Sequence, residues 1–298
     1  MRRLMWVGIL LMLLAGVAAA QQKRDFSKVE IKVTKVTDAV YMLQGSGGNI
    51  TALVGPDGVV MVDTEFAELA PKIEAALRGV TDKPLRFIIN THWHFDHTDG
   101  NAAWSAKAPI LSNDKLRARM VSGGKVLGMD FKPAPPEALP AITYPDRMAL
   151  HLNGEDIEIV HYPAAHTDGD SVVFFPKEHV AATGDEYFAN IFPFIDLDSG
   201  GSVRGYIDAV DKQIAMYPED VKIIPGHGPL STLADFRAYA SMLRDCEGIV
   251  EDGMRHGKTA DQMKQEKVLA KYHKWASSFI DEDKFIDTLY KSLSAEKK

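Results

Sequence analysis

The sequence predicts an α/β fold, a four-layer αββα sandwich in which two mixed β-sheets are flanked by helices. One observation behind this prediction is that strand-like and helix-like segments alternate twice in the same order, once in each half of the chain. Another is that segments such as 85–91 and 221–227 are apolar enough to be buried strands. Because no short-period repeat is present, we expect two packed sheets and no solenoid.

The first half is predicted to begin with a meander of three antiparallel strands. These runs are rich in strand-forming residues and are broken by Gly or by Pro-Asp-Gly: 39–45, 49–55 and 58–64. Residues 65–80 then have helical spacing with a stop at Gly79, and 85–91 form a strand. A weaker helix over 113–122 leads into 131–140, whose prolines predict a loop.

The second half is predicted to repeat this order. A hairpin over 148–163 turns at Asn153-Gly154, the pair most typical of a two-residue turn. The elements expected after it are two strands, an amphipathic helix, a buried strand and a largely helical C-terminal part, over 170–176, 179–185, 202–218, 221–227 and 231–293.

The first twenty residues have the pattern of a secretory signal peptide. A basic start precedes an apolar run over 4–17, and Ala18 and Ala20 occupy the positions that a signal peptidase recognises. We therefore expect residues 1–20 to be cleaved and the protein to be periplasmic or secreted, with an uncleaved anchor as the alternative. Residues 21–298 are predicted to form one domain, with additional C-terminal helices from about 250.

Charge and cysteine content exclude several classes of partner. The chain has 34 basic and 41 acidic side chains, a net charge of −7, which argues against binding to nucleic acid or to an anionic membrane surface. Cys246 is the only cysteine, so no intrachain disulfide can form. The expected partner is a small-molecule substrate, without nucleic acid and without stable membrane insertion. The sequence leaves the oligomeric state open.

A cluster of metal-ligand side chains stands directly after the strand predicted at 85–91. The stretch NTHWHFDH places His92, His94, Asp96 and His97 within six positions. Three more potential ligands, His166, Asp185 and His227, each follow another predicted strand. Because sites gather at the carboxyl ends of neighbouring strands in layered α/β folds, these seven side chains predict a metal site.

Spacing suggests how these ligands are shared between two ions. His92 and His94 are two residues apart, so in an extended segment they point the same way. The natural partition places them with His166 on one metal, and Asp96, His97 and His227 on a second. Asp185 has two oxygens and could bridge the two ions. Imidazole and carboxylate ligands suit zinc, so we expect two zinc ions per chain, with iron or manganese as secondary alternatives.

Each ligand also has a plainer interpretation. Asp96 could cap the helix that follows it, and Gly184-Asp185 is a common turn pair. The five histidines outside the pattern are interpreted as structural or exposed: His151, His161, His179, His256 and His273. Trp93, Phe95 and Tyr187 are expected to pack in the core. The apolar loop after Asp185 would either wall the cleft or belong to the core; it contains Phe188, Ile191, Phe192, Phe194 and Ile195.

These motifs resemble the metallo-β-lactamase-fold hydrolases over about residues 35–245. The resemblance rests on His92-x-His94-x-Asp96-His97, then His166, Gly184-Asp185 and the PGHGP stretch that contains His227. It implies the αββα sandwich and a binuclear site at which a metal-bound hydroxide attacks a carbonyl or phosphoryl centre. It also matches Asp63, in VMVDT, to a buried aspartate that supports the metal-binding loop from behind the ligands.

One departure bears on the substrate. The commonest zinc β-lactamases carry a cysteine where this chain has Asp185, and a lysine three residues later, where it has Phe188. Asp185 instead resembles the bridging aspartate of glyoxalase II-type thioesterases and of lactonases. The fold name therefore does not identify the substrate.

The expected function is a secreted binuclear zinc hydrolase that cleaves an ester, lactone, thioester or amide bond, β-lactams included, by metal-bound hydroxide. Asp96 is the expected catalytic residue, orienting the hydroxide or passing its proton to the leaving group. One alternative is a single-iron persulfide dioxygenase-type enzyme that uses His92, His94 and the bridging position. Another is a non-catalytic periplasmic zinc-binding protein.

Overall fold

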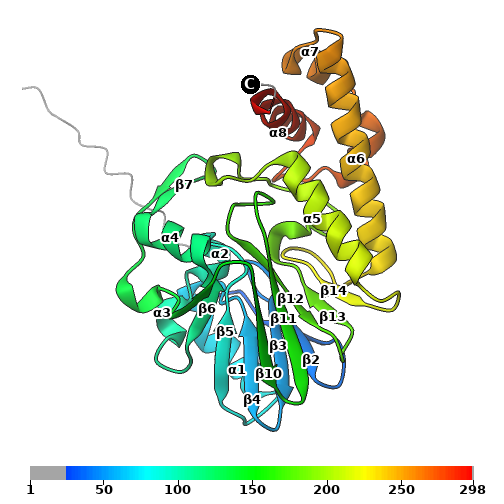
Figure 1. Cartoon of the computed structure of the whole chain (residues 1–298). Coiled ribbons are helices and arrows are strands. Elements are labelled where there is room, and N and C mark those ends of the chain that lie inside the picture. Colours follow the sequence, from blue (N-terminus) through cyan, green and yellow to red (C-terminus); the bar gives the residue numbers. More distant parts are fainter. Residues whose placement is uncertain (1–24, 297–298) are drawn as a thin grey trace, which may run out of the picture.

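The computed structural model describes residues 25–296 and confirms two β-sheets packed face to face with helices outside (Figure 1). The first sheet has seven strands in the order β1-β2-β3-β4-β5-β6-β9. Strands β1 to β4 pair antiparallel, and β4, β5, β6 and β9 pair parallel, so the sheet is mixed. Its strands are Lys32–Lys35, Val40–Gln44, Ile50–Gly55, Gly58–Val62, Leu85–Ile89, Ile110–Asn113 and Ile142–Tyr144.

The second sheet has six strands in the order β10-β11-β12-β13-β14-β15. All its pairings are antiparallel except that of β13 with β14. Its strands are Arg147–Leu152, Glu155–Tyr162, Asp170–Phe175, Val180–Ala182, Lys222–Ile224 and Ser231–Thr232. The predicted hairpin is confirmed, with Asn153 and Gly154 in left-handed conformations at its turn.

Central strands of both sheets are buried on two faces. In β4, Val60 and Val62 face the other sheet, whereas Val59 and Met61 face the helical layer outside. In β12, Val173 and Phe175 face the first sheet, and Val172 and Phe174 face the opposite helices. Successive side chains of a strand point to opposite faces, and in these strands the side chains on both faces are apolar. Both faces must therefore be covered.

Helices cover the outer face of each sheet. Helix α1 (Ala70–Arg78), preceded by the turn η1 (Ala67–Leu69), packs on the first sheet, and Gly79 caps it as predicted. Helices α5 (Val203–Met216) and α6 (Leu233–Arg255) pack on the second sheet. Each of these two helices begins at a side-chain cap: Ser202 accepts from the Gly205 N–H, and Thr232 forms a capping box with Asp235.

The C-terminal part adds a helical layer beyond one end of the sandwich. Helix α6 extends past the sheets, and α7 (Ala260–Gln265) and α8 (Glu282–Ala295) lie beyond them (Figure 1). The turn η5 (Ala270–Trp275) connects this region to the core, where the Phe192 N–H donates to the Trp275 carbonyl. Within residues 25–296, no helix combines the length and the apolar character needed to cross a bilayer.

Several elements differ from the sequence prediction. Strands β1, β6, β9 and β15 were not predicted, because they are short and lack a clear apolar alternation. The segment predicted as a strand over 179–185 ends at Ala182 and continues as the turn η3 (Gly184–Glu186). The proline-rich loop contains one helical turn, η2 (Pro136–Ala138). The predicted signal peptide lies outside the described residues.

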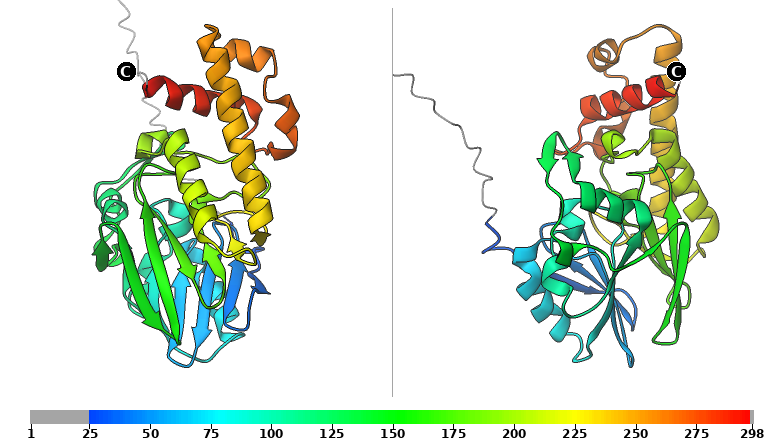
Figure 2. Two further views of the ribbon diagram at one scale, coloured as in Figure 1. Left: turned by 45° about the vertical axis from the view of Figure 1, so that its right-hand side comes forward. Right: turned by 60° about the vertical axis from the view of Figure 1, so that its left-hand side comes forward.

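A small hairpin that was also not predicted stands between the two halves. Strands β7 (Gly124–Val126) and β8 (Met129–Phe131) follow helix α4 (Asp114–Ser122) and pair through a two-residue turn. Val126 packs with Trp93, Leu116 and Met120 in a satellite apolar cluster beside the metal-ligand loop. Figure 2 shows this hairpin, in green, rising beside the red helix α8.

Candidate metal centre

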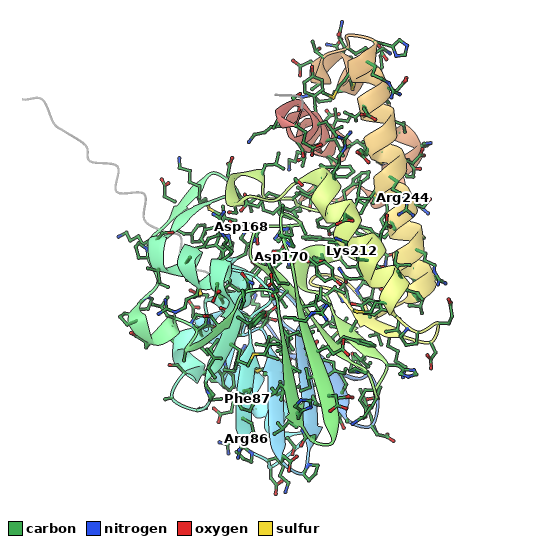
Figure 3. The ribbon with its side chains drawn as sticks, in the orientation of Figure 1. Arg86, Phe87, Asp168, Asp170, Lys212 and Arg244 are labelled. Atoms are coloured by element: carbon green, nitrogen blue, oxygen red, sulfur yellow. The ribbon has the colours of Figure 1, made fainter. Side chains whose placement is uncertain are left out.

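The candidate site lies at the end of the sandwich where strands β5, β11, β13 and β14 end and the loops that follow them begin. Strand β5 ends at Ile89, and the chain then turns through His92 into the short helix α2 (Phe95–Thr98). Asp168 and Asp170, which follow His166, lie at this end, whereas Arg86 and Phe87 of β5 lie at the opposite end (Figure 3). The strand-end placement predicted from the sequence is therefore correct.

The structure brings the seven predicted side chains together in two groups. In the first group, His92, His94, His166 and Asp185 each offer a ligand atom within 4.8 Å of the others. All four residues are buried. His94 Nδ1 lies 2.9 Å from His166 Nε2, and the rings of His92 and His166 are perpendicular at 4.6 Å. Three imidazoles thus converge on one point with different ring planes.

The second group consists of Asp96, His97 and His227, again with ligand atoms within 4.8 Å of one another. The Nε2 atoms of His97 and His227 are 3.4 Å apart, and Asp96 Oδ2 lies 3.3 Å from His227 Nε2. Asp96 stands inside the first turn of α2, and no side chain caps that helix. The alternative interpretation of Asp96 as a helix cap is therefore wrong.

Asp185 lies between the two groups and offers one oxygen to each. Its Oδ1 is 3.1 Å from His97 Nε2 and 3.3 Å from His227 Nε2. Its Oδ2 is 3.7 Å from His92 Nε2 and 3.5 Å from His166 Nε2. Gly184 reaches this position with a φ of +51°, so the Gly-Asp pair does form a turn, and that turn is what aims the carboxylate.

A single buried carboxylate, that of Asp63, orients two of the histidines. Asp63 Oδ2 accepts from His97 Nδ1 at 2.7 Å and from the Thr91 hydroxyl at 2.7 Å, while Oδ1 accepts from the Thr91 N–H at 2.8 Å. Because the Thr91 hydroxyl donates to Asp63, it accepts from His92 Nδ1, 3.0 Å away. Both imidazoles therefore turn Nε2 toward the site.

Two further groups behind the ligands were not found from the sequence. Asp196 Oδ2 lies 2.9 Å from His94 Nε2, which leaves Nδ1 of that ring facing the site. The Phe194 carbonyl accepts from His166 Nδ1 at 2.8 Å. No motif distinguishes Asp196 from its neighbour Asp198, because the contact depends on how the loop after Asp185 folds back. The carbonyl has no sequence signal at all.

The electrostatics of the two groups differ. Burial lowers the pKa of His92 well below its usual range, and it lowers that of His166 to about 4, so both rings are neutral. Burial also opposes protonation of His227, but the charges of Asp185 and Asp96 outweigh this effect and raise the His227 pKa to about 10. Burial opposes protonation of His97 as well, but the charges of Asp185, Asp63 and Asp96 raise its pKa. The second group therefore attracts positive charge.

Two observations test whether these residues fit metal ions. His92 Nε2 and Asp185 Oδ1 are buried side-chain atoms without a hydrogen-bond partner, although both lie among potential ligands. The backbone beside the site also leaves space that only glycine allows: a Cβ on Gly48 would lie 2.1 Å from the His97 ring, and one on Gly226 would lie 2.1 Å from Asp185 Oδ1. Nitrogen and carboxylate donors with unsatisfied lone pairs fit divalent cations such as zinc.

A cavity of about 350 Å³ opens over the centre. His94, Asp96, Asp185 and His227 form its polar side. The loop after Asp185 divides between the two roles suggested by the sequence. Its lining members are Phe188, Ile191 and Phe194, whereas Phe192 and Ile195 are buried in the core.

The aromatic residues next to the candidate ligands differ in their burial and in whether they line the cavity. Trp93 is buried as predicted, with its Nε1–H donating to Ser199 Oγ at 3.2 Å. Tyr187 packs between Phe236 and Tyr239 and does not line the cavity. Phe95 was expected in the core, but it is only half-buried and lines the cavity. It lies there because α2 turns it toward the β7–β8 hairpin, where it stacks on Phe131 at 4.9 Å.

None of the five remaining histidines belongs to either group. His151, His256 and His273 are exposed and His179 is half-buried, and each of these four has a carboxylate within 3.5 Å of its ring. His161 is half-buried, and its Nδ1 lies 2.6 Å from the Asp170 carbonyl. These contacts agree with the structural or exposed roles expected for them.

Comparisons with known proteins define the class. Residues 43–227 match the family described as the Metallo-beta-lactamase superfamily. The metallo-beta-lactamase type 2 of Bacteroides fragilis is 24% identical over 238 residues, covering 74% of this chain and 89% of that protein. The structure of the DIM-1 metallo-beta-lactamase superposes with a TM-score of 0.62 at 17% identity, covering 73% of this chain and 99% of that one.

A longer relative also matches. The linear primary-alkylsulfatase of a Pseudomonas species is 22% identical over 253 residues, which cover 70% of this chain. The match spans only 47% of the sulfatase, so the chain corresponds to about half the length of that relative.

Fold and site together define a two-sheet αββα protein with a candidate metal centre lined by histidine and aspartate side chains. The chain belongs to the metallo-β-lactamase superfamily, a superfamily of metal-dependent hydrolases, as its motifs indicated.

Proposed function

We propose that the protein is a secreted binuclear zinc hydrolase that cleaves an ester, lactone, thioester or amide bond, β-lactams included. The observation that carries the proposal is the position of Asp185, whose two carboxylate oxygens each face a separate group of imidazoles. One ion would be held by His92, His94 and His166, and a second by Asp96, His97 and His227, with Asp185 shared. When bound, two such ions supply Lewis acidity and a nucleophile derived from water at neutral pH.

The protein's own residues define how this centre would work. Asp63, Asp196 and the Phe194 carbonyl hold three of the imidazoles in fixed tautomers, so little reorganisation is needed when substrate arrives. Interactions with His97 and His227 lower the pKa of Asp96 to about 2 even though burial opposes this. Asp96 is therefore ionised, and it lines the cavity, where its carboxylate can orient the attacking water by accepting a hydrogen bond from it.

The second group of ligands argues against the single-iron alternative. A mononuclear centre built on His92, His94 and Asp185 would leave Asp96, His97 and His227 without a role. Yet these three side chains converge within 4.8 Å, and His97 and His227 lie 3.1 and 3.3 Å from the second Asp185 oxygen. The non-catalytic alternative is disfavoured by the cavity, which gives a small molecule direct access to the centre.

Removal and return of the metal test the proposal. We expect purified protein to hydrolyse at least one member of a panel of p-nitrophenyl esters, lactones, thioesters and β-lactams. Because one relative is named as an alkylsulfatase, an alkyl sulfate belongs in the panel as the competing bond class. Dialysis against a chelator should abolish the activity, and zinc should restore it. Activity that survives chelation would overturn the proposal.

A matched pair of histidine variants controls for general damage. His227→Ala removes a ligand of the second ion and should reduce kcat/KM by at least 100-fold. His179→Ala removes a half-buried histidine outside the site, whose Nδ1 lies 2.8 Å from Asp220 Oδ1, and it should leave kcat/KM unchanged. Secretion is tested separately: mass spectrometry of the exported protein should place its first residue near Gln21.

A further inference from the structure

The cavity over the centre is apolar wherever it is not formed by the candidate ligands. Its walls come from remote segments: Leu127 at the tip of the β7–β8 hairpin, Phe194 in the loop after Asp185, and Phe279 just before α8. The rings of Phe194 and Phe279 lie 6.0 Å apart, and Phe194 also lies 5.8 Å from the His94 ring. The wall thus begins at the ligands and ends at the protein surface.

No lysine or arginine is among the described residues that line this cavity. Arg119 and Lys132 line the neighbouring cavity instead. Arg119 is also committed to Asp168, with Nε 2.5 Å and Nη2 2.9 Å from the two carboxylate oxygens. A substrate carboxylate placed among Leu127, Phe194 and Phe279 would lose hydration without gaining an ion pair, and this makes its burial unfavourable.

The turn of the β7–β8 hairpin has an apolar residue, Leu127, at a position whose backbone conformation favours asparagine. Two hairpins in this chain have two-residue turns of the same left-handed geometry. Asn153-Gly154 has φ values of 58° and 73°, and Leu127-Gly128 has 53° and 76°. Asparagine is well suited to such a conformation, whereas leucine is strained there. Leu127 is also 45% exposed, so burial in a core does not compensate for the strain.

A strained, exposed leucine at the mouth of an apolar cavity points to a role in binding. We propose that Leu127, Phe194 and Phe279 form an apolar clamp that receives an uncharged alkyl or aryl group of the substrate. The substrate class is then a neutral ester, lactone, thioester or amide whose hydrophobic part extends from the scissile carbonyl toward the hairpin. Leu127 and Phe279 are its specificity-determining residues. The scissile carbonyl of this substrate rests on the proposed function, whereas the apolar clamp is inferred from the cavity and the hairpin turn.

Uncleavable ketones measure the clamp without any hydrolysis. Acetophenone, butyrophenone and hexanophenone share a carbonyl and an aryl ring and differ in alkyl length. In titration calorimetry with the zinc-loaded protein, we expect affinity to rise about fourfold for each methylene that the clamp covers. Affinity that does not change with chain length would overturn the proposal.

Variants separate a binding role from a structural one. Leu127→Asn suits the turn better, so the melting temperature should stay equal or rise while the chain-length dependence flattens. Leu127→Met should keep that dependence, and Phe279→Ala should weaken it. Met216→Ala, which removes another exposed apolar side chain from helix α5, should have no effect. If Leu127→Asn leaves the chain-length dependence intact, Leu127 does not bind substrate.

A charged substrate tests selectivity. We expect kcat/KM for p-nitrophenyl hexanoate to exceed that for mono-p-nitrophenyl adipate by at least tenfold, and Leu127→Lys to narrow the ratio. Equal rates for both esters would exclude selection of neutral substrates. Binding of ketones with clear chain-length dependence, but no hydrolysis of any ester, lactone, thioester or amide in the panel, would retain the clamp and overturn the proposed function. Hydrolysis together with ketone affinities that do not depend on chain length would retain the proposed function and overturn the clamp.

Discussion

Replacement of Asp63 by asparagine should weaken both metal sites at once, although Asp63 belongs to neither group of ligands. Its Oδ2 accepts two hydrogen bonds, from His97 Nδ1 and from the Thr91 hydroxyl, each 2.7 Å long. Its Oδ1 accepts a third, from the Thr91 N–H at 2.8 Å. Asparagine keeps the shape but replaces one acceptor oxygen with an N–H₂ group, which would face a donor in either orientation of the amide.

The expected magnitude follows from the number of bonds lost. Loss of an outer hydrogen-bond partner typically reduces metal affinity by about 10- to 100-fold, or about 1.4 to 2.8 kcal/mol. Because the Thr91 hydroxyl relays the effect to His92, we expect a loss in this range at each site. Titration of chelator-treated protein with zinc, in competition with a chromophoric chelator, measures the two dissociation constants separately.

Thr91→Val provides the matched control. Valine keeps the shape and the backbone N–H of Thr91 but removes the hydroxyl between Asp63 and His92. It should therefore weaken the site of His92 by about tenfold while leaving the site of His97 within about threefold of wild type. Equal losses at both sites in Thr91→Val, or a loss at only one site in Asp63→Asn, would refute the shared-carboxylate argument.

Three further predictions concern the bridge, the backbone and pH. Asp185→Ala should weaken zinc binding at Asp96, His97 and His227 more than at the other site, which keeps three imidazoles. Equal losses of affinity at the two sites in a zinc titration would reject the bridging role. Gly48→Ala drives a Cβ into the His97 ring and should lower kcat/KM at least tenfold, whereas Gly248→Ala, which meets no atom within 4 Å, should not. Burial raises the pKa of Asp170 from 3.8 to about 7, so the folded state holds a proton that the unfolded chain has released, and stability falls as pH rises through this window. Relative to wild type, Asp170→Asn should therefore gain about 2 kcal/mol between pH 5 and 8 in urea unfolding, and an unchanged difference would contradict that pKa.

The main architecture could be predicted because its signals are local. β4 is a continuous apolar run and β12 contains one over 172–175, and such short runs of β-branched and aromatic residues indicate strands buried on both faces. The convergence of the candidate ligands could be predicted for a related reason: His92, His166, Asp185 and His227 each follow a strand, and strand ends meet in this type of fold. Local pattern together with topology was enough to bring them together.

Other parts of the site depend on contacts that no local pattern encodes. Glu65 is an example: with a φ of 50°, its buried carboxylate accepts from the N–H groups of Gly45, Ser46 and Gly47. This fastens the loop whose Gly48 N–H donates to the Asp96 carbonyl. In the sequence, Glu65 looks only like the first residue of a helix. Its role follows from the tertiary fold.

The β7–β8 hairpin escaped prediction for a different reason. Its strands are three residues each, and the Leu127-Gly128 turn lacks the asparagine that marks the turn at Asn153. The absence of a turn signal at Leu127 is the same feature that suggests a binding role for this residue.

The number of divalent cations bound per chain tests the central claim most directly. Elemental analysis of zinc-loaded protein after gel filtration should give two ions per chain, because Asp185 presents one oxygen to each of two imidazole groups. One ion per chain, unchanged when His97 and His227 are both replaced by alanine, would contradict the binuclear centre.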